Sequence, residues 1–452
     1  MELKLYPKYK DSGILWIREI PEGWEVHRLK FLLSSLESGS RETGGGSQLD
    51  EGVFSLGGEH INWDGTLNLE NPKLISEDYY NSMNQGKLKI NDVLLVKDGA
   101  TIGKTAILKE MKYKKMAVNE HIFLMRANKR IKPKLLYYLI SSDSGFKQIK
   151  LTETGSAQGG INQDFKGLVL FTIPPNVKEQ DSLISFLDKK TAKIDALIEK
   201  DKKLIALLKE KRTALINQVV TKGLDPNVKL KDSGIEWIGK IPEGWEVHRQ
   251  KFLVSKINSG ITPKGGAEVY EEDGIPLLRS QNIHFEGLRL NDVAFIPEEI
   301  HKTMLNSVVK NHDVLINITG ASIGRCTYVN GEFEKANVNQ HVCIIRPKKI
   351  NYKYLTYFLI SKHGQDQVFS IQMGSSREGL NFEQLGNFVI SFPPLPDQTA
   401  IANFLDKATS KIDKTIQKIE KKIKLLEEYK KSLIHHVVTG KVDVRGLKHE
   451  TY

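Results

Sequence analysis

The chain has 452 residues, 40% of them hydrophobic and 27% charged, which is ordinary for globular domains, and its length predicts about three of them. No run of about 18 apolar residues occurs, and the start lacks the apolar core of a secretory signal, so we expect a soluble cytoplasmic protein without membrane contact. Lys and Arg exceed Asp and Glu by 11, which favours an anionic partner such as nucleic acid or, equally on composition, a solvated lysine-rich helix face. Only Cys326 and Cys343 are present, without metal or redox spacing, so no metal site is expected.

Residues 1–30 contain two tryptophans around a Pro-Glu-Gly bend, in the stretch DSGILWIREIPEGWE. We call this stretch the clasp and predict a packed structural turn in which the tryptophans are buried. Residues 31–175 then alternate short β-like runs with loops, the runs being Val93–Val96, Ala106–Leu108, His121–Met125 and Leu168–Phe171, together with one helix over 134–149. This mixture predicts an α+β domain.

The stretch 181–223 has no proline and no internal glycine, and its apolar residues recur at heptad spacing. Such spacing is typical of a coiled-coil seam, and about 40 helical residues span roughly 60 Å, so a partner helix is required. The predicted seam residues of this helix are Leu187, Ile194, Ile198, Leu208 and Leu215. Asp201 falls on the same seam, where it either fixes the register or sits at a frayed, solvent-facing position.

The second half of the chain repeats the first with a period of about 220 residues, far longer than solenoid repeats. The clasp returns at Asp232, VKDGATIGKTAIL returns as NITGASIGRCTYV, and FLDKKTAKID returns as FLDKATSKID. A second α+β domain and a second heptad helix follow, with seam residues Ile412, Ile416, Ile419, Leu426 and Leu433. The framework is duplicated while the domains have diverged, as in a protein that binds two different targets.

Several stretches resemble catalytic motifs, but each lacks the spacing or the neighbouring residues that the chemistry requires. The turn 99–105 has three residues between its glycines where a phosphate-binding P-loop needs four, and its second copy lacks the Lys-Ser/Thr ending. The Pro-Pro pairs before the long helices lack the polar and aromatic neighbours of an adenine methyltransferase motif, and His435 and His436 point about 100° apart on a helix. We therefore expect no catalytic residues and no bound cofactor.

The clasp, SGITPKGG, LRSQNI, GASIGR, VNQH and the Asp-Gln…IANFLDKATSKID helix start resemble the specificity subunit of type I restriction–modification systems, over essentially the whole chain. The resemblance implies two α/β target recognition domains joined by two long helices that form an antiparallel coiled coil, with internal pseudo-twofold duplication. It implies double-stranded DNA, two methyltransferase subunits and restriction (translocase) subunits as partners. S-adenosylmethionine, ATP and Mg²⁺ would be used by those partners, for adenine N6-methylation and for ATP-dependent cleavage, and this chain would be non-catalytic. The expected divisions are a first recognition domain (1–175), a first spacer helix (176–223), a second recognition domain (224–394), a second spacer helix (395–445) and a tail (446–452).

Candidate DNA contacts are polar residues on predicted loops. Arg279, Gln281 and Asn282 suit base edges, because Arg pairs with guanine and Asn or Gln with adenine. Phosphate contacts are assigned to Arg41, Lys104, Lys264 and Arg325, and either role is open to Gln158 and Arg377. The first domain has Ser-Gly-Ser-Arg where the second has the Thr-Pro loop. The repeated runs Asn119-Glu120-His121 and Asn339-Gln340-His341 fit a structural role at a strand end or DNA contact.

Two other classes compete with this reading. A free-standing DNA-binding regulator would not need such long helices, because their outer faces are expected to bind another protein. A self-sufficient enzyme would methylate DNA from labelled S-adenosylmethionine as an isolated chain, and we predict no such activity.

Overall fold

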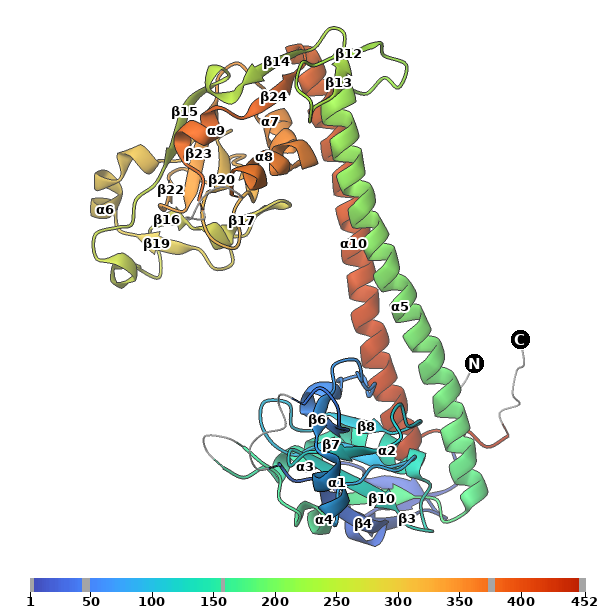
Figure 1. The fold of residues 1–452 in the computed structure, drawn as a ribbon. Coiled ribbons are helices and arrows are strands. Elements are labelled where there is room, and N and C mark those ends of the chain that lie inside the picture. Colours follow the sequence, from blue (N-terminus) through green and yellow to red (C-terminus); the bar gives the residue numbers. More distant parts are fainter. Residues whose placement is uncertain (1–3, 43–48, 156–158, 373–378, 447–452) are drawn as a thin grey trace. The chain divides into compact units, whose positions relative to one another are not determined.

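The computed structural model describes residues 4–42, 49–155, 159–372 and 379–446. The chain forms two compact units, one of Met1–Asp201 with Lys421–Tyr452 and the other of Lys202–Glu420. Each unit therefore combines one globular half with segments of both long helices, which are labelled α5 and α10 in Figure 1.

The first globular half contains the strands β1 (Tyr9–Asp11), β2 (Glu19–Pro21), β3 (Glu25–Arg28), β4 (Leu33–Ser38), β5 (Val53–Leu56), β6 (Lys73–Ile75), β7 (Val93–Val96), β8 (Thr105–Ile107), β9 (Met116–Val118), β10 (Ile122–Ala127) and β11 (Leu170–Ile173). Its helices are α1 (Glu77–Ser82), α2 (Pro133–Ser141), α3 (Asp143–Leu151) and α4 (Phe165–Leu168), with 3-10 turns η1 (Leu29–Phe31) and η2 (Gly58–His60). A four-stranded antiparallel sheet, β4-β10-β7-β8, adjoins a three-stranded sheet, β6-β5-β9, in which β5 and β9 are parallel.

The second half repeats this plan with β12 (Leu230–Asp232), β13 (Lys240–Pro242), β14 (Glu246–Arg249), β15 (Val254–Ser259), β16 (Ile275–Leu278), β17 (Ile283–His284), β18 (Gly287–Leu288), β19 (Ala294–Ile296), β20 (Val314–Asn317), β21 (Cys326–Tyr328), β22 (Asn337–Val338), β23 (Val342–Pro347) and β24 (Val389–Phe392). Its helices are α6 (Glu298–Thr303), α7 (Tyr352–Ile360), α8 (Lys362–Gln372) and α9 (Phe382–Gly386), with 3-10 turns η3 (Gln250–Phe252), η4 (Gly266–Val269), η5 (Ser280–Asn282) and η6 (Leu305–Ser307). Its sheets, β15-β23-β20-β21 and β19-β16-β22, have the same order as those of the first half. The predicted α+β class and the internal duplication are thus confirmed.

The clasp holds the junction between a globular half and the helices. Trp24 is 1% exposed, and its indole N–H donates to Glu179 Oε1 at 3.0 Å, near the start of α5. Gly440 follows α10 with φ +72°, and a Cβ there would lie 2.3 Å from Cδ of Pro21, so only glycine fits against the clasp. The prediction that the clasp tryptophans are buried is wrong for Trp16 and Trp237, which are 51% and 42% exposed.

The long helices are α5 (Val177–Lys222) and α10 (Leu395–Val438). Near its start, each helix has a buried glutamine that binds backbone groups of its own domain. Gln180 Nε2 donates to the carbonyls of Arg130 and Pro174 at 2.8 and 3.0 Å, and Oε1 accepts from the amide of Lys132 at 2.9 Å. Gln398 repeats this role near the start of α10, where its Nε2 donates to the Pro393 carbonyl at 2.8 Å. These bonds fix the direction in which each helix leaves its domain.

Ion pairs along the helices establish their antiparallel direction. In the first unit, Lys430 Nζ lies 2.7 Å from Asp195, whereas the earlier Lys422 pairs with the later Asp201 at 2.8 Å. In the second unit, Arg212 Nε lies 3.1 Å from Asp413. The predicted antiparallel coiled coil is therefore observed in this structure.

Most residues of the predicted seam are buried. Leu187, Ile194, Ile198, Ile412, Ile416, Ile419 and Leu433 are at most 9% exposed. Leu208, Leu215 and Leu426 are half-buried. Leu187, Ile194, Ile198 and Leu433 also pack into the core of the first globular half, so the helix ends belong to the domain core as well as to the seam.

Candidate nucleic-acid interface

Three turns of the second half converge at one end of its sheets. They are the β16–η5 turn, the β20–β21 turn and the β22–β23 turn, and they are joined by backbone hydrogen bonds from Asn339 to Leu278 at 3.1 Å and from Ile318 to His341 at 3.0 Å. Together they line an open hollow of about 460 Å³, whose polar residues include Gln281, Thr319 and Arg325. Two of the sequence-predicted contacts, Gln281 and Arg325, therefore lie in one site.

The first half has the same backbone arrangement at its equivalent turns. The amide of Asn119 donates to the Leu56 carbonyl at 3.0 Å, and the amide of Lys97 donates to the His121 carbonyl at 3.0 Å. The side chains of Asn119 and Asn339 each accept a hydrogen bond from the backbone amide two residues later. This bond supports the structural role for the asparagine of each repeated run, and it leaves the two following side chains half-buried or exposed.

A histidine and a polar partner stand at the same place in each half, although the sequence prediction did not pair them. His121 Nδ1 lies 2.6 Å from Asp98 Oδ1, and its Nε2 lies 3.4 Å from Glu120 Oε1. His341 Nδ1 lies 2.6 Å from the Thr319 hydroxyl instead. The signal that could have found Asp98 and Thr319 is their shared position in the two copies of the glycine turn.

The predicted base contacts differ in exposure. Gln281 is exposed, with Nε2 donating to Asp292 Oδ2 at 2.7 Å. Arg279 is half-buried, with its guanidinium 5.6 Å from the centre of the Tyr270 ring. Asn282 is 1% exposed, and its side chain accepts from the Arg279 amide and donates to the Arg289 carbonyl, both at 2.9 Å. In this structure Asn282 stabilises its own turn and presents no exposed edge.

The remaining predicted contacts are spread along the chain. Arg41 and Lys264 are exposed, and Lys104 is half-buried with its ammonium 5.9 Å from the centre of the Trp63 ring. Gln158 and Arg377 lie outside the described residues.

Asp201 occupies a buried seam position, so the solvent-facing alternative is wrong. It is 6% exposed, and the ammonium of Lys422 lies 2.8 Å from Oδ2 and 3.1 Å from Oδ1. The lysine side chain remains 53% exposed, so the carboxylate is neutralised from the water side.

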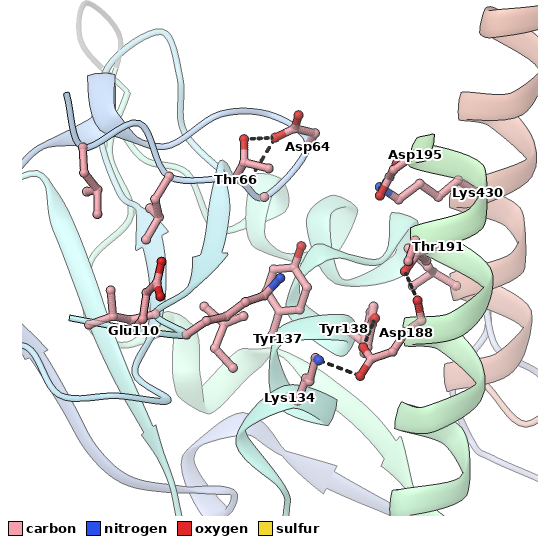
Figure 2. A pocket seen from close by; sticks show the side chains of 18 residues that line it. Asp64, Thr66, Glu110, Lys134, Tyr137, Tyr138, Asp188, Thr191, Asp195 and Lys430 are labelled. Carbon is pink, nitrogen blue, oxygen red and sulfur yellow. Dashed lines mark hydrogen bonds and ion pairs between the residues drawn. The ribbon is translucent and has the colours of Figure 1, made fainter. Parts of the chain in front are cut away.

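A second cavity, of about 480 Å³, lies within the first unit between the globular half and the helices (Figure 2). On its helix wall, Asp188 accepts from the Tyr138 hydroxyl at 2.6 Å and lies 2.5 Å from Lys134 Nζ. Burial, followed by the hydrogen bond to Asp188, raises the pKa of Tyr138.

The second unit repeats that wall, where Asp406 accepts from the Tyr357 hydroxyl at 2.8 Å and pairs with Lys353 at 2.5 Å. Because this arrangement is duplicated and its charges are paired, we assign it to holding each domain on its helix.

The described residues contain neither a membrane-spanning helix nor a cluster of metal-ligating side chains. No helix among them is long and apolar enough to cross a membrane. They also contain no group of three or more His, Cys, Asp or Glu side chains able to hold a metal ion.

The chain is similar to proteins of known family. The family model for the type I restriction modification DNA specificity domain matches twice, over residues 21–207 and 242–425. The type I restriction enzyme MjaVIII specificity subunit of Methanocaldococcus jannaschii is 25% identical, over 79% of this chain and 80% of its own length.

Two solved structures have a similar fold. A chain from a structure of a type I R-M system matches with a TM-score of 0.65 at 18% identity, covering 94% of this chain and 99% of its own. The HsdS subunit from Thermoanaerobacter tengcongensis matches with a TM-score of 0.50 at 16% identity, covering 94% and 98%.

Proposed function

The chain belongs to the type I restriction–modification specificity subunits, which are non-catalytic, and we propose that it reads a bipartite, asymmetric DNA sequence for such a complex. Each half would read one part of the site, with recognition domains at 1–175 and 224–394 and spacer helices at 176–223 and 395–445. The observation that carries this proposal is the duplicated turn framework, which holds different side chains at the same positions in the two halves.

DNA contact is assigned to the ends of the sheets where the turns converge. Gln281 and Arg279 would contact base edges, and Arg325, Lys104, Lys264 and Arg41 would contact phosphates. Gln158 and Arg377 remain candidates from the sequence. Two linked readers bind one DNA molecule with a high effective concentration for the second contact, so modest half-site affinities suffice.

The other partners follow from the same role. We propose that the helices dock two methyltransferase subunits, and that restriction subunits join through them. S-adenosylmethionine, ATP and Mg²⁺ would then act in those partners, where the target adenine is flipped out of the duplex for methylation.

The test maps methylated adenines in DNA from cells that express this chain with its methyltransferase subunit. The expected result is one split motif with a fixed gap, absent from cells that lack this chain. Deleting one heptad from each long helix removes about 10 Å of helix, which corresponds to about three base pairs of DNA. The gap should shorten or methylation should stop, and full methylation with an unchanged gap would refute the spacer role.

The rival regulator makes a different prediction. The isolated chain would then bind its site tightly and specifically without any methyltransferase subunit, and its removal would leave DNA methylation unchanged.

A further inference from the structure

At three matched positions of the converging turns, the first half has acidic side chains and the second half has neutral polar ones. Alignment of LGGEH with LRSQN, VKDG with NITG and VNEH with VNQH pairs Glu59 with Gln281, Asp98 with Thr319, and Glu120 with Gln340. We define each set of three as the reading edge of its half. The first edge carries carboxylates, whereas the second carries amides and a hydroxyl.

These positions are structurally equivalent as well as aligned. The 3-10 turn of each half is closed by a side chain that accepts from the amide three residues earlier, from Gly57 to His60 and from Arg279 to Asn282, both at 2.9 Å. The glycine turns close alike, with Gly103 donating to Val96 at 3.0 Å and Gly324 donating to Asn317 at 2.9 Å. The backbone therefore presents the two edges in the same way.

The carboxylates of the first edge lie near one another. Asp98 and Glu120 flank the His121 ring, at 2.6 and 3.4 Å. A Cβ built on Gly57 would come within 2.4 Å of Glu59 Oε2 and 2.8 Å of Asn119 Nδ2, which places Glu59 beside the turn that carries Glu120. Glu59 also pairs with Lys73. Burial is the largest single influence and raises the pKa of Glu59, but the hydrogen bond from Lys73, a backbone hydrogen bond and the nearby positive charges together outweigh it, so the pKa is lowered.

The second edge borders the hollow described above, and a buried acceptor lies beneath it. Asn317 is fully buried, and its Nδ2 donates to the Ser280 carbonyl at 2.9 Å and to the Ser322 hydroxyl at 3.0 Å, both from residues that line the hollow. Its Oδ1 has no hydrogen-bond partner among the described residues. The first half has Val96 at this position.

A carboxylate only accepts hydrogen bonds, so it suits the N4 amino group of cytosine and repels the O6 and N7 acceptors of guanine. An amide both donates and accepts, and it matches the N6 and N7 pair of adenine. Three carboxylates also oppose the phosphates of DNA, so the first edge needs base donors to approach the groove at all.

We propose, within the DNA-reading function above, that the first half selects a cytosine through its carboxylate edge and the second half selects an adenine through its amide edge. Gln281 and Glu59 are the principal discriminating residues, and Gln340 and Glu120 act beside them. Thr319 and Asp98 position the histidine of each edge.

The experiment uses the assembled methyltransferase complex and a plasmid library randomised across both half-sites, with methylated positions read by sequencing. The variants are E59Q and E120Q in the first half, Q281E and Q340E in the second. The control is E77Q. Glu77 is exposed, pairs with Lys115 and is not part of the reading edge, so this substitution removes one negative charge without changing the edge.

The expected result for E59Q or E120Q is a loss of cytosine discrimination at one first-half position by roughly tenfold or more, with the second half-site unchanged. Q281E or Q340E should lower adenine selection in the second half-site by a similar factor and leave the first unchanged. E77Q should leave both half-sites as in the wild type.

Unchanged base preferences in all four edge variants, in a wild-type complex that methylates a split site, would overturn this inference alone. A wild-type complex that methylates no split site would overturn the proposed function instead. Thermal unfolding of each variant separates a changed preference from a misfolded domain, because a misfolded half loses its whole half-site.

Discussion

The ion pair between Asp201 and Lys422 makes the seam testable by one substitution on each side. Asp201 is 6% exposed, so its carboxylate has lost most of its water, and the ammonium of Lys422 at 2.8 Å is its counter-charge. Removing one partner of a fully buried pair costs about 3–5 kcal/mol, because the other charge is left uncompensated. Since the Lys422 side chain is 53% exposed, water can reach the remaining charge, and we expect K422M to cost about 1–2 kcal/mol.

The reciprocal change has the opposite sign. D201I removes a desolvated carboxylate and puts an isoleucine in its place. Isoleucine already occupies the buried positions Ile194 and Ile198 of the same helix. Replacing a buried charge by an apolar side chain is often neutral or stabilising, so we expect a change between zero and about 2 kcal/mol in favour of the folded state. The seam would then lose the charged marker of register at this position.

Hydrogen exchange of the α5 amides around Asp201 measures the local free energy of opening in the full chain. K424M, at an exposed lysine two residues further on, removes the same charge and should leave exchange unchanged. K422M as stable as the wild type, or D201I less stable by more than about 1 kcal/mol, would refute the assignment of a net cost to the buried carboxylate.

Three further perturbations test the framework. D188N and D406N each weaken a tyrosine and a lysine contact at matched places, so each should cost about 1–2 kcal/mol and speed exchange only in its own unit. G440A meets the clasp proline ring and should lower the melting temperature clearly more than G446A, which has the same φ sign and open space. Burial lowers the pKa of His435, so the unfolded chain takes up its proton first, and stability should fall as pH drops below about 6.5; H435Q should reduce that slope in unfolding measured from pH 8 to 5.

The sequence was sufficient to predict the duplicated plan and the helix pair, because heptad spacing and literal repeats are local signals. It did not reveal where tertiary contacts interrupt a helix. The helix expected over 134–149 is broken at Ser142, whose hydroxyl accepts from the Gly145 amide at 3.1 Å and starts α3. A Cβ on Gly145 would lie 2.1 Å from the Leu139 carbonyl, so this close packing requires glycine.

The sequence predicted which turns form the candidate site, but only some of the side chains that line it. The repeated glycine turn drew attention to Lys104 and Arg325, since a turn shared by two diverged domains is visible in one sequence. The burial of Asn282 and the pairing of Asp98 with His121 depend on which loops meet in space, and no spacing along the chain reports that.

Buried charges explain why the framework stays alike while the edges differ. Arg126 Nε lies 2.9 Å from Asp92, and Arg346 Nε lies 2.7 Å from Asp313, at matched places in the two sheets. These carboxylates are 3% and 0% exposed, so changing either partner alone leaves a buried charge and costs several kcal/mol. An edge residue such as Glu120 faces solvent on one side, where a change to glutamine costs little in the fold. Divergence of a duplicated reader is therefore expected at the edges first, and the three carboxylate-to-neutral differences lie there.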